Sequence, residues 1–281
     1  MNRLIGLAII VVVALAILLP ISPVGAVTEV WQPALNTPWQ WMIDHPLRLG
    51  NAKDMGLVAP DGTALKTPPP VMYDIDGWFN PASTVAALHA QGKKVVCYLD
   101  IGVYEDYRPD AWRFPASVIG RADGNWDGSW WLDIRRIDIL GPIMRDRMLM
   151  CKDKGFDAIE PDEIDGYANR SGFPLTYADQ LAYNRWIADT AHSLGLSIGL
   201  KGDIEQAVDL EPWFDWTLNE ECWQYRECDY YDLGVFTRHN KAVFQVEYKT
   251  ATSNFCPKDN ARNWNGLRTR LNLAGGRWPC R

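Results

Sequence analysis

The fold of this chain is indicated most clearly by the stretch Lys154-Gly-Phe-Asp-Ala-Ile-Glu-Pro-Asp-Glu-Ile-Asp-Gly-Tyr167. The pattern predicts that a helix ends at Gly155 and that an apolar strand follows from Phe156 to Glu160. Four carboxylates then fall within six residues: Glu160, Asp162, Glu163 and Asp165. A buried strand that delivers acids at its carboxyl end has the usual geometry of a catalytic site in an α/β barrel.

A second acidic pair, Glu220 and Glu221, follows a similar strand predicted from Phe214 to Leu218. Because the carboxyl ends of barrel strands meet at one face, we expect this pair to lie near the first group. Cys222 and Cys228 come directly after it and bracket a short aromatic loop. A local disulfide between them would stiffen a loop at the site.

The same unit of helix, glycine and strand recurs along the chain. The predicted strands span residues 37–44, 71–76, 94–100, 156–160, 197–201, 214–218, 242–248 and 266–272. The predicted helices span residues 81–90, 136–154, 177–194, 203–210, 230–240 and 257–264. Eight strands separated by helices favour a closed (β/α)8 TIM-type barrel over an open doubly wound sheet. No Gly-x-Gly-x-x-Gly motif follows the first strand and no phosphate loop is present, which disfavours a nucleotide-binding sheet.

The first 26 residues differ from the rest of the chain. Arg3 precedes an unbroken apolar run from Leu4 to Leu19, Pro20 breaks the run, and Val24-Gly-Ala26 supplies small residues for a cleavage site. This order is typical of a secretory signal peptide. We therefore expect one barrel domain over residues 27–281 and a secreted protein without a stable membrane span. The alternative is an uncleaved membrane anchor.

Composition narrows the possible ligands. A formal net charge of -7 gives no support to nucleic-acid binding. The 4 histidines are scattered without metal-ligand spacing, so we expect no metal and no organic cofactor. Many of the 14 tryptophans stand beside Gly, Pro, Asn or Asp, which suggests loops whose aromatic faces bind sugar rings. The alternative, that tryptophan fills the core, accounts for about half of them.

Export makes the 6 cysteines candidates for disulfides. Besides the local pair in the loop after Glu221, Cys256 and Cys280 could tie the C-terminus to the body of the protein. Cys97 and Cys151 could pair or remain buried thiols. The sequence leaves the connectivity open.

Nearly every predicted strand delivers a charged residue to the same rim: Asp44, Asp76, Asp100, Glu160, Asp162, Asp165, Lys201, Asp203, Glu220, Glu221 and Glu247. Glycoside hydrolysis requires one acid that protonates the leaving oxygen and a second carboxylate that acts as nucleophile or activates water. A rim rich in carboxylates and poor in histidine fits that chemistry.

Several strings resemble glycoside hydrolase family 114, which includes secreted endo-α-1,4-polygalactosaminidases. They are Val-Val-Cys-Tyr-Leu-Asp-Ile-Gly (95–102), residues 155–167, Asn-Glu-Glu-Cys-Trp-Gln-Tyr-Arg-Glu-Cys (219–228), Val246-Glu-Tyr248 and Gly266-Leu-Arg268. The resemblance runs from about Pro38 to the C-terminus. It implies a TIM-type barrel, cleavage of partly deacetylated α-linked galactosamine polymers, and catalytic carboxylates at Asp162 and Glu220.

The residues themselves leave some roles open. Glu160 could point into the barrel, and Asp165 could orient substrate or cap a helix. Glu221 competes with Glu220, because adjacent strand residues point in opposite directions. Lys201 could keep neighbouring acids ionised or form a plain structural ion pair. We expect a retaining mechanism with Asp162 as nucleophile and Glu220 as acid/base.

The remaining expectations concern the substrate. The side chains predicted to bind it are Tyr73, Asp76, Asp100, Glu160, Asp165, Tyr167, Lys201, Glu221, Trp223, Glu247, Trp130 and Trp131, with Trp126 as a further sugar platform. Glu105 and Arg108 are predicted to form an ion pair at the rim. The galactosamine polymer that the resemblance implies carries free amines, and an acidic cleft attracts such cations. We expect the protein to be a monomer with this polysaccharide as its partner. The competing hypotheses are a non-catalytic carbohydrate-binding barrel and a glycosidase for another α-linked polysaccharide.

Overall fold

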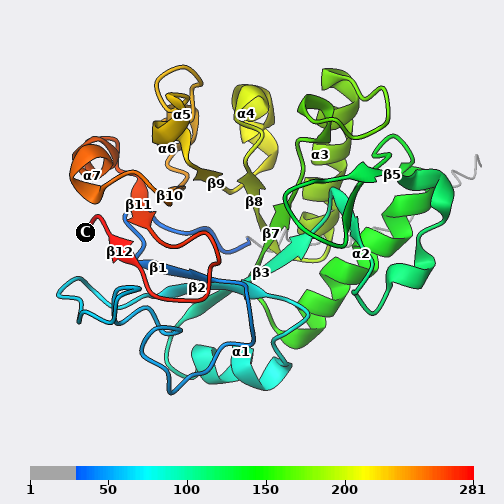
Figure 1. Cartoon of the computed structure of the whole chain (residues 1–281). Coiled ribbons are helices and arrows are strands. Elements are labelled where there is room, and N and C mark those ends of the chain that lie inside the picture. The colour runs from blue at the N-terminus through cyan, green and yellow to red at the C-terminus, as the bar shows by residue number, and fades with distance from the viewer. Residues whose placement is uncertain (1–29) are drawn as a thin grey trace, which may run out of the picture.

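Eight parallel strands form the centre of the computed structural model, which describes residues 30–281 (Figure 1). They are β1 (Trp39–Met42), β2 (Met72–Asp76), β3 (Lys94–Asp100), β7 (Ala158–Asp162), β8 (Ser197–Lys201), β9 (Trp216–Glu220), β10 (Val243–Glu247) and β11 (Asn265–Arg268). Neighbours in this order pair with each other, and β12 (Trp278–Pro279) adds an antiparallel partner to β11. The predicted TIM-type barrel is confirmed. The predicted signal peptide, residues 1–26, lies outside the described residues.

The helices surround the strands (Figure 1). They are α1 (Ala82–His89), α2 (Ile137–Lys154), α3 (Tyr177–Ser193), α4 (Ala207–Leu210), α5 (Cys222–Tyr225), α6 (Gly234–Arg238) and α7 (Thr252–Ala261). Short 3₁₀ turns occur at Ala111–Arg113, Ala116–Val118, Gly166–Ala168, Ile204–Gln206 and Glu211–Trp213. Within residues 30–281, no helix is long and apolar enough to cross a membrane.

The strand residues alternate between two separate apolar cores, as the two-residue period of a strand requires. One core fills the barrel interior and includes Trp39, Trp41, Met72, Val96, Ala158, Trp216, Leu218, Phe244, Val246 and Tyr248. The other lies between strands and helices and includes Tyr73, Ile75, Cys97, Leu99, Ile159, Ile198, Leu200 and Val243. A strand residue an even number of positions from a member of the interior set therefore also faces the barrel interior, and its immediate neighbours face the helices.

Gly199 on β8 makes room for an interior ring. A Cβ atom at this position would lie 2.5 Å from ring atoms of Trp216 on β9, which is closer than real Cβ contacts allow. The indole fills the space that a side chain would need, and its Nε1 donates to Ser197 Oγ at 3.2 Å.

The first and last parallel strands meet at a seam. Trp39 Nε1 on β1 donates to the backbone carbonyl of Asn265 on β11 at 3.0 Å. Beside it, a disulfide between Cys256 and Cys280 ties α7 to the residue after β12. Disulfides also join Cys97 on β3 to Cys151 on α2, and Cys222 to Cys228. The structure thus contains the two disulfides that the sequence suggested, and it pairs Cys97 with Cys151, which the sequence had left open.

One region has no counterpart in the sequence predictions. Between β3 and α2, the strands β4 (Val103–Glu105), β5 (Ile119–Ala122) and β6 (Ser129–Leu132) form an antiparallel sheet in the order β4-β6-β5. Each strand has only three or four residues, and the long loops between them gave no periodic signal. This small sheet stands at the carboxyl ends of the barrel strands and supplies part of the pocket described below.

Candidate active site

A pocket of about 650 Å³ opens at the carboxyl ends of the strands. Its lining holds eight carboxylates: Asp44, Asp76, Asp100, Glu105, Asp127, Asp162, Glu163 and Glu220. Against them it holds two cationic side chains, Arg108 and Lys201. A strongly negative, partly enclosed surface concentrates positively charged ligands.

Lys201, the last residue of β8, lies at the centre of the strand-end acids. Its Nζ is 2.9 Å from Asp162 Oδ1, 3.1 Å from Glu220 Oε1 and 2.8 Å from Glu160 Oε1, and its side chain is buried. Burial by itself lowers the pKa of Lys201, but the three carboxylates outweigh burial and raise that pKa well above its ordinary value. Lys201 therefore stays charged and connects Asp162 to Glu220.

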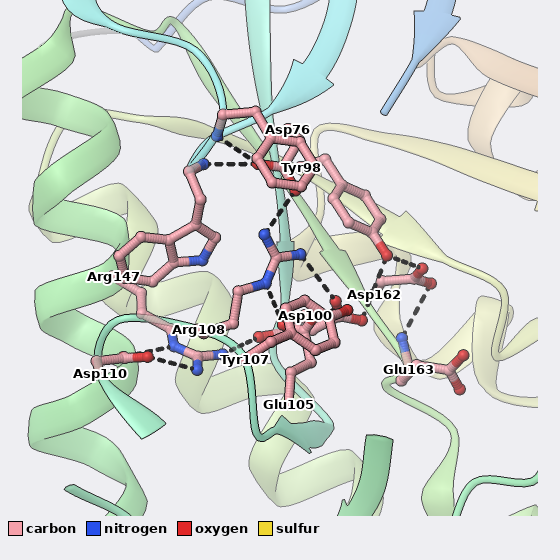
Figure 2. Close-up of polar contacts among 12 residues, drawn as sticks. Asp76, Tyr98, Asp100, Glu105, Tyr107, Arg108, Asp110, Arg147, Asp162 and Glu163 are labelled. Carbon is pink, nitrogen blue, oxygen red and sulfur yellow. Dashed lines mark hydrogen bonds and ion pairs between the residues drawn. The ribbon is translucent and has the colours of Figure 1, made fainter. Parts of the chain in front are cut away.

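Asp162 ends β7, two residues beyond the predicted end of that strand. The Tyr98 hydroxyl donates to its Oδ2 at 2.8 Å, and the Glu163 backbone N–H donates to its Oδ1 at 3.0 Å (Figure 2). Glu163, at a left-handed φ of 57°, also lines the pocket. Burial, followed by the charge of Asp162, raises the pKa of Glu163 well above its ordinary value.

Glu220 ends β9 in the same way. Its side chain is 31% exposed, and the Tyr248 hydroxyl donates to its Oε2. Glu221 turns away with a left-handed φ of 54°, its backbone N–H donates to the carbonyl of Val246, and its side chain does not line the pocket. Of the two adjacent glutamates, the structure brings Glu220 to Asp162.

The two carboxylates are close together. Because a single nitrogen lies 2.9 Å from Asp162 Oδ1 and 3.1 Å from Glu220 Oε1, those oxygens can be no farther apart than the sum of the distances, about 6 Å. A sugar bond placed across them would have one carboxylate within reach on each side.

Arg108 organises a second part of the lining (Figure 2). It lies 2.7 Å from Glu105 Oε2, 2.9 Å from Asp76 Oδ2 and 3.6 Å from Asp100 Oδ2. The predicted pair of Glu105 and Arg108 is confirmed, but both residues line the pocket itself. Burial, followed by the charge of Glu105, raises the pKa of Asp100 well above its ordinary value. Burial also raises the pKa of Asp76, although Arg108 opposes the shift.

Tyr73, expected at the substrate, is instead an outer-core residue. It is 1% exposed and its hydroxyl donates to the Met55 carbonyl at 3.2 Å. Glu247 is fully buried between Val246 and Tyr248, which both face the interior, and it accepts the Trp223 backbone N–H at 2.9 Å. Strand alternation turns both residues away from the pocket.

Several other expected contacts also lie elsewhere. Trp223 donates from Nε1 to Asp259 at 2.7 Å and packs on the outer core. Tyr167 donates to Glu205 at 2.8 Å. Trp130, Trp131 and Asp165 also do not line the pocket. Asp165 Oδ1 accepts a hydrogen bond from Asn169 Nδ2 at 3.0 Å. Burial raises the pKa of Asp165 to about 6.

Trp126, one of the expected sugar platforms, does line the pocket and is 52% exposed. The aromatic residues Trp41, Phe79, Tyr98, Tyr107 and Tyr248 also line it and were not predicted. Strand alternation could have identified two of them, because Tyr98 shares the inward set with Asp100, and Tyr248 shares it with Val246. Glu160 is fully buried beneath the lining and accepts from Trp41 Nε1 at 2.9 Å. Among residues 30–281, no group of three or more His, Cys, Asp and Glu side chains could hold a metal ion.

Comparison with known proteins adds an independent observation. The family model for glycoside hydrolase family GH114 matches residues 21–281. The chain belongs to GH114. A search of curated protein sequences finds no match to this GH114 chain.

Solved structures agree with the family assignment. Ega3 from Aspergillus fumigatus, crystallised in complex with galactosamine, is 33% identical to the GH114 chain with a TM-score of 0.76, and the match covers 91% of this chain and 100% of that one. The glycoside hydrolase domain of PelA from Pseudomonas aeruginosa matches at 12% identity and a TM-score of 0.55, over 75% of this chain and 93% of that one. The second likeness concerns the fold alone.

Proposed function

We propose that this GH114 protein is a secreted, endo-acting glycoside hydrolase that cleaves α-1,4-linked galactosamine polymers. The observation that carries the proposal is the pair Asp162 and Glu220, held on either side of Lys201 in an acidic pocket. Two carboxylates that flank a scissile bond are the requirement for glycoside hydrolysis.

Asp162 is the proposed nucleophile. Donors from Tyr98, Lys201 and the Glu163 backbone fix its oxygens for attack on the anomeric carbon. Glu220 is the proposed acid/base, because its partial exposure allows water to reach it while Tyr248 holds its other oxygen. Glu220 protonates the leaving oxygen, and then deprotonates the water that releases the sugar from Asp162.

The spacing supports a retaining mechanism. Retaining glycosidases place their two carboxyl groups about 5–5.5 Å apart, and inverting ones about 6.5–9.5 Å apart to accommodate a water molecule. The two oxygens that contact Lys201, Asp162 Oδ1 and Glu220 Oε1, are at most about 6 Å apart, which suits the closer spacing of a retaining pair.

The choice of substrate rests on charge and on a relative. Galactosamine units with free amines are cations, and the excess of carboxylates in the pocket lining suits them. The relative with 33% identity was crystallised with galactosamine. A neutral polysaccharide would gain nothing from the negative potential.

The N-terminal segment and the disulfides are the grounds for proposing that the protein is secreted. Residues 1–26 have the order of a signal peptide, and three disulfides suit an oxidising compartment. Mass spectrometry of the exported protein should give a mature chain that begins at Val27. Retention of residues 1–26 in a membrane fraction would favour the anchored alternative.

The decisive experiment is mass spectrometry of products from a defined, partly deacetylated α-1,4-galactosamine polymer. Wild type should release oligosaccharides by internal cleavage, and the anomer first formed should keep the α configuration. Asp162→Asn and Glu220→Gln should each lower kcat by a factor of about 10²–10⁴. Glu221→Gln is the matched control and should retain activity, because its side chain lies outside the pocket.

Other outcomes point to the rival functions. If wild type and both variants bind the polymer equally and none cuts it, the protein is a carbohydrate-binding barrel. If wild type cuts only a different α-linked polysaccharide, the proposed substrate is wrong while the two-carboxylate mechanism stands.

A further inference from the structure

Asp74 is a buried carboxyl group inside the barrel to which neither the sequence nor the mechanism assigns a role. It lies in the middle of β2, where Met72 and Asp76 share its inward side, and it pairs in register with Trp41 on β1. Its exposure is 0%, and among the described residues neither carboxyl oxygen accepts a hydrogen bond. An ionised carboxylate in such a place would be strongly unfavourable.

Asp74 faces another acid, Glu160, across the interior: Asp74 pairs in register with Trp41, and Trp41 Nε1 donates to Glu160 Oε2. Glu160 already accepts from Lys201 Nζ at 2.8 Å and from Trp41 Nε1 at 2.9 Å, one donor on each oxygen. Two carboxyl groups can hydrogen-bond only if one of them carries a proton. Because Glu160 has two donors and Asp74 has none, the proton belongs to Asp74.

The charges around this pair agree with the geometry. Burial, followed by the charge of Glu160, raises the pKa of Asp74 well above its ordinary value; Lys201 lowers it and Asp162 raises it further. Burial also raises the pKa of Glu160, and the charge of Lys201 opposes that shift. The neighbouring strand residues Trp41 and Val96 carry no charge.

We propose that Asp74 is a permanently protonated positioning residue, which donates its O–H to Glu160 and thereby holds Lys201 between Asp162 and Glu220. The inference rests on the proposed function of those two carboxylates. Asp74 fixes the orientation of Glu160. Of the three carboxylates that form ion pairs with Lys201, Glu160 is the one that takes no part in the proposed reaction. Without the contact with Glu160, the Lys201 ammonium would move toward whichever of Asp162 and Glu220 is charged.

Two substitutions separate proton donation from packing. Asp74→Asn keeps the size and supplies an N–H donor to Glu160, so it should retain most of kcat. Asp74→Leu has a similar volume but cannot donate, so kcat should fall about 10²-fold, the usual effect of a displacement near 1 Å in a catalytic group. In this variant Glu160 also gains affinity for protons, so the acidic limb of the pH–kcat profile should move to higher pH.

The matched control is Asp215→Asn, which alters a buried acid that accepts the Ile198 backbone N–H, away from the pocket. It should leave kcat and the pH profile unchanged. The melting temperature of each variant reports folding. If folded Asp74→Leu keeps wild-type kcat and pH profile, or if Asp74→Asn is as impaired as Asp74→Leu, the proposal is overturned.

A second measurement does not depend on catalysis. Isotope-edited infrared spectra of wild type at neutral pH should contain a protonated carboxylic acid band that disappears in Asp74→Asn. Absence of such a difference band would refute the proton on Asp74 even if the enzyme is active. If the band is present but wild type cuts no galactosamine polymer, the proposed function fails while the protonated acid stands.

Discussion

Lys201 shows how much depends on one residue at the end of a strand. Its ammonium is shared by Glu160, Asp162 and Glu220, which are delivered by two different strands. In the proposed mechanism Asp162 loses its charge when the covalent intermediate forms, and the same ammonium can then remain paired with the other two. A cation in this position makes a close pair of carboxylates electrostatically tolerable.

Lys201→Met keeps a long side chain and removes the charge. Without the ammonium, Asp162 and Glu220 lose the cation that contacts both of them, so their placement should change and kcat should fall roughly 10²-fold. Steady-state kinetics of the folded variant and wild type check this. An unchanged kcat in a folded variant would argue that Lys201 is structural only.

At the scale of elements, the small sheet β4-β6-β5 changes the view of substrate binding. Its residues and loops contribute Glu105, Tyr107, Arg108 and Trp126 to the pocket. The barrel strands therefore carry the proposed chemistry, and this insertion between β3 and α2 covers one side of it. A sugar chain bound in the pocket would lie against the insertion.

Trp126→Ala tests whether the insertion that carries the small sheet binds the sugar chain. The half-exposed indole offers a flat apolar face, and its loss should raise KM by about 3- to 10-fold with less effect on kcat. Trp112→Ala is the matched control, because Trp112 is 84% exposed but lies outside the pocket. Equal kinetic effects of both substitutions would exclude a specific role for Trp126.

Gly199→Ala tests the interior packing of β8 and β9. The added methyl group would collide with the Trp216 ring at 2.5 Å, and overpacking of this kind costs about 1–3 kcal/mol of unfolding free energy. Urea denaturation measures the change. Gly50→Ala, where no atom lies within 4 Å of the new Cβ, should be nearly neutral. A stable Gly199→Ala protein would mean that Trp216 can move.

Strand periodicity explains which parts of the fold were predictable. Buried runs such as Lys94–Asp100 and Ser197–Lys201 match the predicted strands residue for residue. The strand predicted from Phe156 to Glu160 instead runs from Ala158 to Asp162 as β7. The predicted 230–240 helix shortens to α6, since its flanking residues form turns. The small sheet could not be predicted, because its pairing depends on contacts with loops rather than on local pattern.

The site was predictable only in part for a related reason. The order of residues in the sequence shows which acids follow the predicted strands. The alternation of side chains along each strand then determines which of these acids face the barrel interior. Continued one residue past β10, alternation separates Tyr248, whose hydroxyl donates to Glu220, from the outward Glu247. The protonation of Asp74 depends on neighbours from other strands, so the sequence alone held no signal for it.

The molecule as a whole buries acids whose ionisation opposes folding. Asp203 is 5% exposed, and burial, followed by the charge of Asp165, raises the pKa of Asp203 to about 9. The folded state thus keeps a proton that the unfolded chain releases near pH 4. The associated stability is present below about pH 4 and is lost as the pH rises toward 9.

Asp203→Asn should remove this dependence. Asparagine cannot ionise, it tolerates the left-handed φ of 42°, and it can still accept from Asn184. Urea denaturation should give nearly equal stabilities for variant and wild type at pH 4, and an advantage of about 1–3 kcal/mol for the variant at pH 8. Asp209→Asn, at an exposed position on α4, should show no such growth with pH. A variant advantage that is the same at both pH values would contradict the linkage.

The seam between β1 and β11 also has a consequence for the order of folding. Trp39 and Asn265 are 226 residues apart in the chain, so their contact cannot form until nearly all of the protein has been synthesised. Until then the edge of β1 lacks its contact with β11, and exposed strand edges invite association between chains. Closing so long a loop is slow compared with forming local helices. The nascent barrel is therefore most vulnerable to aggregation just before its last strands arrive.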